Sequence, residues 1–187
     1  MTQDRPALID RLIEAERAVA DFFAALSPDE MVTRTGDAWS PAEHLMHLNI
    51  TTSAIAGGFS ASRLLLRLRF GRARAPSRTC EALRDDYRAL LAAGGTAPPE
   101  FVPPRVVDAL TPSPQLQMDL LARWASVNGR LRTALQSWDE RSLDRLRLPH
   151  PLLGRITARE MACFAVYHAH HHITAAQRRL PRFGAAS

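Results

Sequence analysis

The sequence contains no lysine and only two cysteines, Cys80 and Cys163, among its 187 residues. Two cysteines are too few for a disulfide scaffold or for a thiolate metal cluster. No apolar run approaches the roughly 18 residues that a transmembrane helix needs, and acidic residues near the N-terminus do not fit a signal peptide. We therefore expect one domain over residues 1–187, in a reducing cytoplasm and without membrane association.

Basic residues outnumber acidic ones by 24 to 19, but this excess is local. The segment 63–78 holds six arginines and no acid, which leaves 18 basic and 19 acidic residues elsewhere. A basic, amphipathic segment can bind nucleic acid or a membrane surface, or it can be a solvated helix end whose arginine stems cover apolar surface. It lacks the interleaved aromatic residues on which bases stack, so we expect no nucleic-acid partner.

The periodicity of apolar residues predicts four long helices and no strand. Capping boxes at Ser40–Glu43 and Thr157–Glu160 mark the starts of two of them. The pattern indicates an all-α four-helix bundle, with a proline-rich crossover at 96–114 and a short extra helix at 80–92. The long helices are expected at residues 5–26, 40–68, 115–138 and 157–180.

Three of the seven histidines lie centrally on apolar helix faces. At about 100° per residue, His168 and His172 share the core-facing stripe of the last helix, and His47 lies on the apolar face of the second. One interpretation is that each is a core residue with a hydrogen-bonding neighbour. The other is that all three bind one divalent ion, which would satisfy three buried imidazoles at once. Zn, Ni, Fe, Co and Mn all fit such ligands.

Three protein ligands leave a coordination position open, which is typical of catalytic metal sites. Glu43 and His44 lie one turn from His47 and are candidates for a base or for a residue that orients a ligand; for Glu43, a purely capping role is the alternative. His150 is expected to be a loop residue. It lies 18 positions before His168, so we do not expect it to be a ligand. His171 is the alternative to His172.

Two stretches resemble the DinB-like superfamily: Trp39-Ser40-Pro41-Ala42-Glu43 followed by His47-Leu48, and His150-Pro151-Leu152-Leu153-Gly154 followed by Thr157, Glu160 and His168-x-x-His171-His172. The resemblance implies an up-down-down-up bundle, often a homodimer, with a metal bound by His47, His168 and His172. Some members are thiol-dependent transferases, isomerases or hydrolases, and many have no known activity. Many carry a glutamine shortly after the last histidine; this chain has Ala175 three residues after His172 and Gln177 two residues further on.

The sequence therefore predicts a metal-dependent enzyme, a thiol S-transferase or a hydrolase, acting on a small molecule that the sequence does not identify. Neither cysteine is a candidate nucleophile, because Cys163 faces away from His168 and Cys80 follows the basic segment. A participating thiol would be a low-molecular-weight cofactor. The alternative is a non-catalytic bundle with a structural metal or packed histidines.

Overall fold

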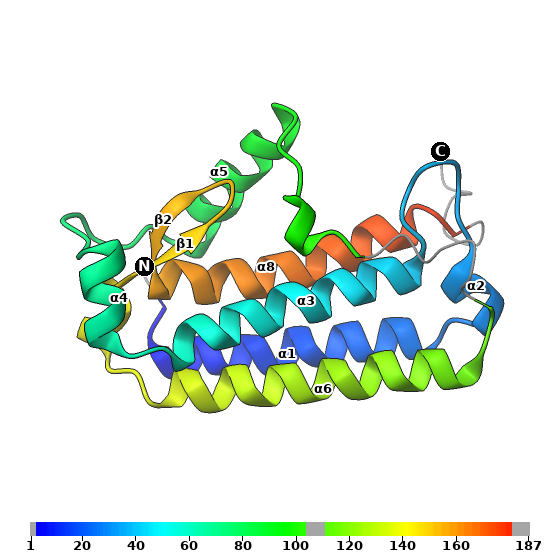
Figure 1. Cartoon of the computed structure of the whole chain (residues 1–187), viewed down its shortest axis with the longest axis horizontal. Coiled ribbons are helices and arrows are strands. Elements are labelled where there is room, and N and C mark those ends of the chain that lie inside the picture. The colour runs from blue at the N-terminus through cyan, green and yellow to red at the C-terminus, as the bar shows by residue number, and fades with distance from the viewer. Residues whose placement is uncertain (1–2, 104–110, 181–187) are drawn as a thin grey trace.

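The computed structural model describes residues 3–103 and 111–180, and within them the chain is mostly helical (Figure 1). Its elements, in chain order, are α1 (Arg5–Ala24), α2 (Pro28–Val32), α3 (Pro41–Ser60), α4 (Arg63–Phe70), α5 (Cys80–Ala92), the 3₁₀ turn η1 (Pro99–Phe101), α6 (Pro114–Gln136), α7 (Glu140–Arg145), β1 (Arg147–His150), β2 (Gly154–Thr157) and α8 (Ala158–Gln177).

The four long helices α1, α3, α6 and α8 form the bundle. Figure 1 shows α1 and α8 running in one direction and α3 and α6 in the other, which is the up-down-down-up order. Helix α1 packs against α6 and α8. Helix α3 also packs against α6 and α8. The antiparallel pair α3 and α8 carries the predicted histidines.

The core contains the apolar stripes that the sequence predicts. Leu8, Leu12 and Val19 of α1 are buried, as are Trp124 and Leu131 of α6. Burying a leucine- or phenylalanine-sized side chain stabilises the fold by about 1.5–3 kcal/mol, so these stripes hold the helices together.

The second long helix is shorter than predicted. It ends at Ser60 and not near residue 68, because Ala61 adopts an extended conformation (φ −68°, ψ 152°) and α4 then starts afresh at Arg63. The pair Gly57-Gly58 is part of this helix. On α4, Leu64, Leu65 and Leu68 are exposed.

A small β-hairpin corrects the expectation of no strand. Strands β1 and β2 pair antiparallel, with His150 opposite Gly154 and Arg147 opposite Thr157. Gly154 has φ +72°, a conformation that favours glycine. The hairpin leads directly into α8, so it fixes where that helix begins. The short helix α7 lies just before the hairpin in the chain.

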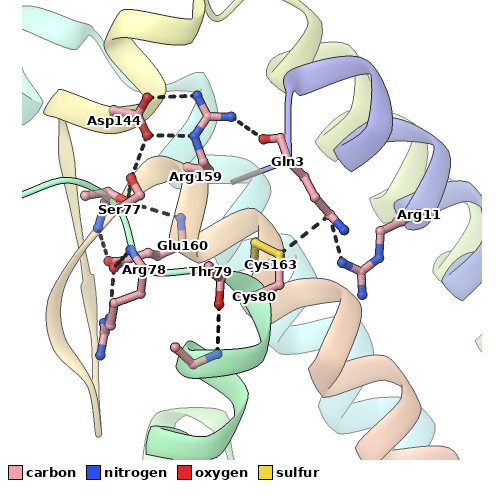
Figure 2. Close-up of a disulfide and its surroundings, with 12 residues drawn as sticks. Gln3, Arg11, Ser77, Arg78, Thr79, Cys80, Asp144, Arg159, Glu160 and Cys163 are labelled. Atoms are coloured by element: carbon pink, nitrogen blue, oxygen red, sulfur yellow. Dashed lines mark hydrogen bonds and ion pairs between the residues drawn. A yellow bond between two sulfur atoms is a disulfide. The ribbon is translucent and has the colours of Figure 1, made fainter. Parts of the chain in front are cut away.

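A disulfide joins Cys80 and Cys163 (Figure 2), although a reducing cytoplasm was expected for this chain. Cys163 does face away from His168, and on that side of α8 it meets the first residue of α5, a helix that packs on α8. Disulfides are more typical of oxidising compartments than of the cytoplasm, so a cytoplasmic location stays a prediction.

The start of α8 is held by charged groups (Figure 2). The Arg159 guanidinium, only 4% exposed, binds Asp144 and Glu140, and it also donates to the backbone carbonyl of Gln3. Arg78 donates from its backbone and its side chain to Glu160, the capping-box residue of α8. These contacts join α8 to the N-terminal segment, the α5 entry and α7.

The crossover between α5 and α6 contains η1, and its described prolines lie outside α-helix except Pro114, which begins α6. Pro104, and Pro181 after the last helix, lie outside the described residues. Among the described helices, none combines the length and the apolar character that crossing a bilayer requires.

Candidate metal centre

The antiparallel packing of α3 and α8 brings His47, His168 and His172 together in the core. The Nε2 atoms of His47 and His168 are 3.2 Å apart, and those of His168 and His172 are 3.0 Å apart. All three side chains are buried, with no more than 6% of any residue exposed. The three predicted ligands thus form one buried cluster, and one nitrogen of each lies within 4.8 Å of the others.

This cluster has the dimensions of a metal site. Two imidazole nitrogens that bind one tetrahedral ion at about 2.0–2.1 Å lie about 3.3 Å apart, close to the separations seen here. Burial lowers the pKa of His168 and of His172 well below the usual range, so both imidazoles are neutral and retain a lone pair for a ligand bond. The residues present therefore fit a divalent cation.

The remaining ring nitrogens of two of these histidines are held by neighbours. His47 Nδ1 lies 2.7 Å from the carbonyl oxygen of Phe101, a contact that requires the proton on Nδ1 and leaves Nε2 unprotonated. His172 Nδ1 lies 2.9 Å from Nδ1 of His44. A hydrogen bond from the second nitrogen of a metal-binding histidine fixes its orientation and tautomer. His44 is thus placed to orient His172, one of the two roles considered for it.

Two neighbours of the cluster were not singled out from the sequence. Phe101 acts through its backbone carbonyl, for which no sequence signal exists. Trp39 precedes α3, and its ring centroid lies 5.0 Å from that of His47 and 6.2 Å from that of His172, with which it is stacked. Trp39 belongs to the motif Trp39-Ser40-Pro41-Ala42-Glu43 at the start of α3. That motif was the sequence signal from which a role for Trp39 could have been predicted.

Glu43, the other candidate base, is engaged elsewhere. Its Oε2 accepts hydrogen bonds from the backbone N–H of Ser40 at 2.7 Å and from Nε of Arg34 at 3.0 Å, and Arg34 also contacts Oε1. Burial raises the pKa of Glu43, but the hydrogen bonds from Arg34 and Ser40 outweigh this and lower it overall. The structure therefore shows Glu43 capping α3 and paired with Arg34.

The neighbouring histidines lie outside the cluster. His170 is exposed, and His171, the alternative to His172, is half-buried with its ring 6.5 Å from Tyr87. The arginine-rich helix α4 lies at the end of the bundle where α8 begins (Figure 1). His168 comes ten residues after Ala158, or about 15 Å along the helix, so α4 is not part of the site.

A cavity of about 210 Å³ opens beside the cluster. His47 and His168 form part of its wall, and the rest comes from α3, α5, the crossover, the hairpin and α8. The other described lining residues are Thr51, Ala54, Ile55, Gly58, Tyr87, Thr96, Ala97, Pro98, Phe101, Leu148, Pro149, His150, Pro151, Leu152, Met161 and Phe164. Two of the three predicted ligand histidines, His47 and His168, are therefore in contact with a largely apolar space.

Comparison with known protein families matches residues 11–176 to the DinB superfamily, and the chain belongs to this superfamily. The match runs from α1 to the end of α8 and so includes the helices that carry all three histidines. No curated protein and no solved structure gives a significant match. The family and the buried histidine cluster together define a DinB-type helical bundle with a site that could hold a metal.

Proposed function

We propose that this protein is a metal-dependent enzyme, a thiol S-transferase or a hydrolase, in which His47, His168 and His172 hold a divalent ion. One observation carries the proposal: two of the three imidazoles form part of a cavity wall. Structural metal sites are closed by their protein ligands, whereas catalytic sites keep a position that water or substrate can reach. A non-catalytic site would have no need of this cavity.

A bound divalent ion would supply Lewis acidity and would lower the pKa of water or of a thiol towards neutrality. The chain's own residues would bind the ion and orient the imidazoles that hold it. His44 and the Phe101 carbonyl hold the imidazoles in place, and Trp39 covers the cluster. Among the described residues that line the cavity there is no carboxylate. The described cavity wall therefore offers no carboxylate base. This favours a reaction in which the nucleophile would be activated by the ion.

The protein has no thiol of its own to serve as nucleophile, because Cys80 and Cys163 are bonded to each other. A thiol-dependent reaction would therefore use a low-molecular-weight thiol, as the sequence predicted. Zn, Ni, Fe, Co and Mn remain candidates for the ion, and a homodimer remains part of the proposal by analogy with the family.

Activity assays on protein reconstituted with each ion test the proposal. The panel contains thiol transfer from small thiols to electrophiles and hydrolysis of uncharged esters and amides. We expect ion-dependent turnover that His168→Ala abolishes and His170→Ala preserves, because His170 is exposed and outside the cluster. Turnover that is equal in both variants, or metal binding without turnover in any assay, would favour the non-catalytic alternative.

A further inference from the structure

The cavity beside the histidine cluster has no charged wall. None of its described lining residues is an arginine, aspartate or glutamate, and the whole chain contains no lysine. In the metal-free protein, a charged ligand placed there would lose its hydration without gaining a counter-ion, which is costly. At about 210 Å³ the cavity is also below the roughly 300–1,000 Å³ of sites for drug-sized ligands. It therefore suits a small, uncharged molecule.

His150 presents a hydrogen-bond donor to this cavity. Its Nδ1 accepts hydrogen bonds from the backbone N–H groups of Leu152 and Leu153 at 3.1 and 3.0 Å, so the proton of the neutral ring is on Nε2. Burial lowers the pKa of His150 to about 4, which keeps the ring neutral near pH 7. The residue is 8% exposed and lines the cavity, yet within the described chain its Nε2 has no hydrogen-bond partner.

Tyr87 of α5 adds a second buried donor of the same kind. It is 7% exposed, it lines the cavity, and its ring lies edge-on to His150 with centroids 5.7 Å apart. Burial raises the pKa of its hydroxyl to about 12, so the group stays protonated. Its hydroxyl, too, makes no hydrogen bond to any residue that the structure describes. The Tyr87 hydroxyl is not among the buried polar atoms that lack a partner, so it is accessible and can donate to a ligand acceptor in the cavity.

One aromatic ring, that of Phe164, contacts both His150 and His168 of the histidine cluster. Phe164 contacts His150 with centroids 4.2 Å apart and is stacked on His168 at 4.8 Å. The rings of His150 and His168 are therefore at most about 9 Å apart, which a small molecule can span.

We propose that this cavity binds a small, uncharged, largely apolar molecule that carries an oxygen acceptor, and that the Nε2–H of His150 donates a hydrogen bond to this oxygen. The rest of the molecule then extends past Phe164 towards His47 and His168. Binding in the cavity requires no metal. Only the chemistry of the part of the molecule that lies near His47 and His168 rests on the proposed function. His150 is thus a positioning residue for substrate.

Titrations of metal-free protein with acetophenone, ethylbenzene and benzoate test this inference. Acetophenone offers a neutral carbonyl oxygen, ethylbenzene has similar size without an acceptor, and benzoate adds a charge. His150→Asn keeps a side-chain oxygen for the amides of Leu152 and Leu153, as in an Asx turn, but its amide group is too short to reach the position of Nε2. We expect this variant to weaken acetophenone binding about threefold to tenfold and to change ethylbenzene binding less than twofold.

A second variant locates the binding site independently. Ala54 lines the cavity but is exposed on α3, so Ala54→Trp should fill the opening without disturbing the core. We expect it to abolish binding of both neutral probes while metal uptake stays at the wild-type level. The inference is overturned if acetophenone does not bind, if benzoate binds as tightly, if Ala54→Trp has no effect, or if His150→Asn weakens both neutral probes equally. A wild-type protein that binds no metal would instead contradict the proposed function.

Discussion

Replacing Arg34 with alanine should destabilise the protein by leaving the Glu43 carboxylate without its charged partner. Glu43 is only 1% exposed, and its two oxygens both contact the guanidinium of Arg34, itself 23% exposed. Removing one partner of a buried ion pair costs about 3–5 kcal/mol. Because Arg34 is partly exposed, we expect about 3 kcal/mol, or a fall in Tm of roughly 6–12 °C for a chain of this size. Urea unfolding followed by circular dichroism measures the loss.

A double-mutant cycle separates the ion pair from other contacts of Arg34. Glu43→Gln keeps the capping box, because glutamine can also accept the Ser40 N–H, and it removes the buried charge. Adding Arg34→Ala to Glu43→Gln should therefore cost at least 1 kcal/mol less than Arg34→Ala alone. Arg67→Ala, at an exposed position of α4, is the matched control and should change stability by less than about 0.5 kcal/mol. Equal losses for Arg34→Ala and Arg67→Ala would refute the reasoning.

Three further predictions concern pH, the disulfide and the basic helix. The lowered pKa of His150, about 4 when folded against 6.5 when unfolded, should cost metal-free protein up to about 3 kcal/mol as the pH falls from 6.5 to 4, and His150→Asn should lack this part of the loss in acid titrations of stability. Replacing Cys80 and Cys163 with alanine opens a loop closed over 83 residues and should lower the unfolding free energy by about 2–4 kcal/mol in denaturant titrations, with unchanged metal content. Reversing the charges of Arg67 and Arg69 should also leave metal content unchanged, and DNA binding by the wild type should be weak and salt-sensitive in mobility-shift assays; tight, sequence-selective binding would revive the nucleic-acid hypothesis.

The features that the sequence predicted are local or periodic. The capping box at Ser40–Glu43 forms as expected, with Glu43 N–H donating to Ser40 Oγ and Ser40 N–H to Glu43. The four-residue step between His168 and His172 places both on the buried face of α8, so their pairing followed from helix geometry, whereas the addition of His47 from α3 was also implied by the family resemblance. Long amphipathic helices are determined mainly by their own sequence, which is why their number and order could be predicted.

The features that the sequence did not predict depend on contacts between distant segments. The hairpin strands have four residues each and include Pro149, so they carry little periodic signal. The Cys80–Cys163 pairing depends on α5 packing against the side of α8 that faces away from the cluster. The contribution of Phe101 is a backbone carbonyl, which any residue provides. His150 was expected to be a loop residue, and only its two accepted hydrogen bonds define it as a donor to the cavity.

Elemental analysis of untagged protein, purified without added metal and then exposed to divalent ions, tests the central claim most directly. We predict about one ion per chain for the wild type and for His170→Ala, whose residue is exposed. Alanine at His47, His168 or His172 should abolish stoichiometric binding, because two imidazoles make a poor site. His171→Ala should retain the ion, because His171 lies outside the cluster. A wild type that binds no ion, or triad variants that keep it, would show that these histidines are core residues only.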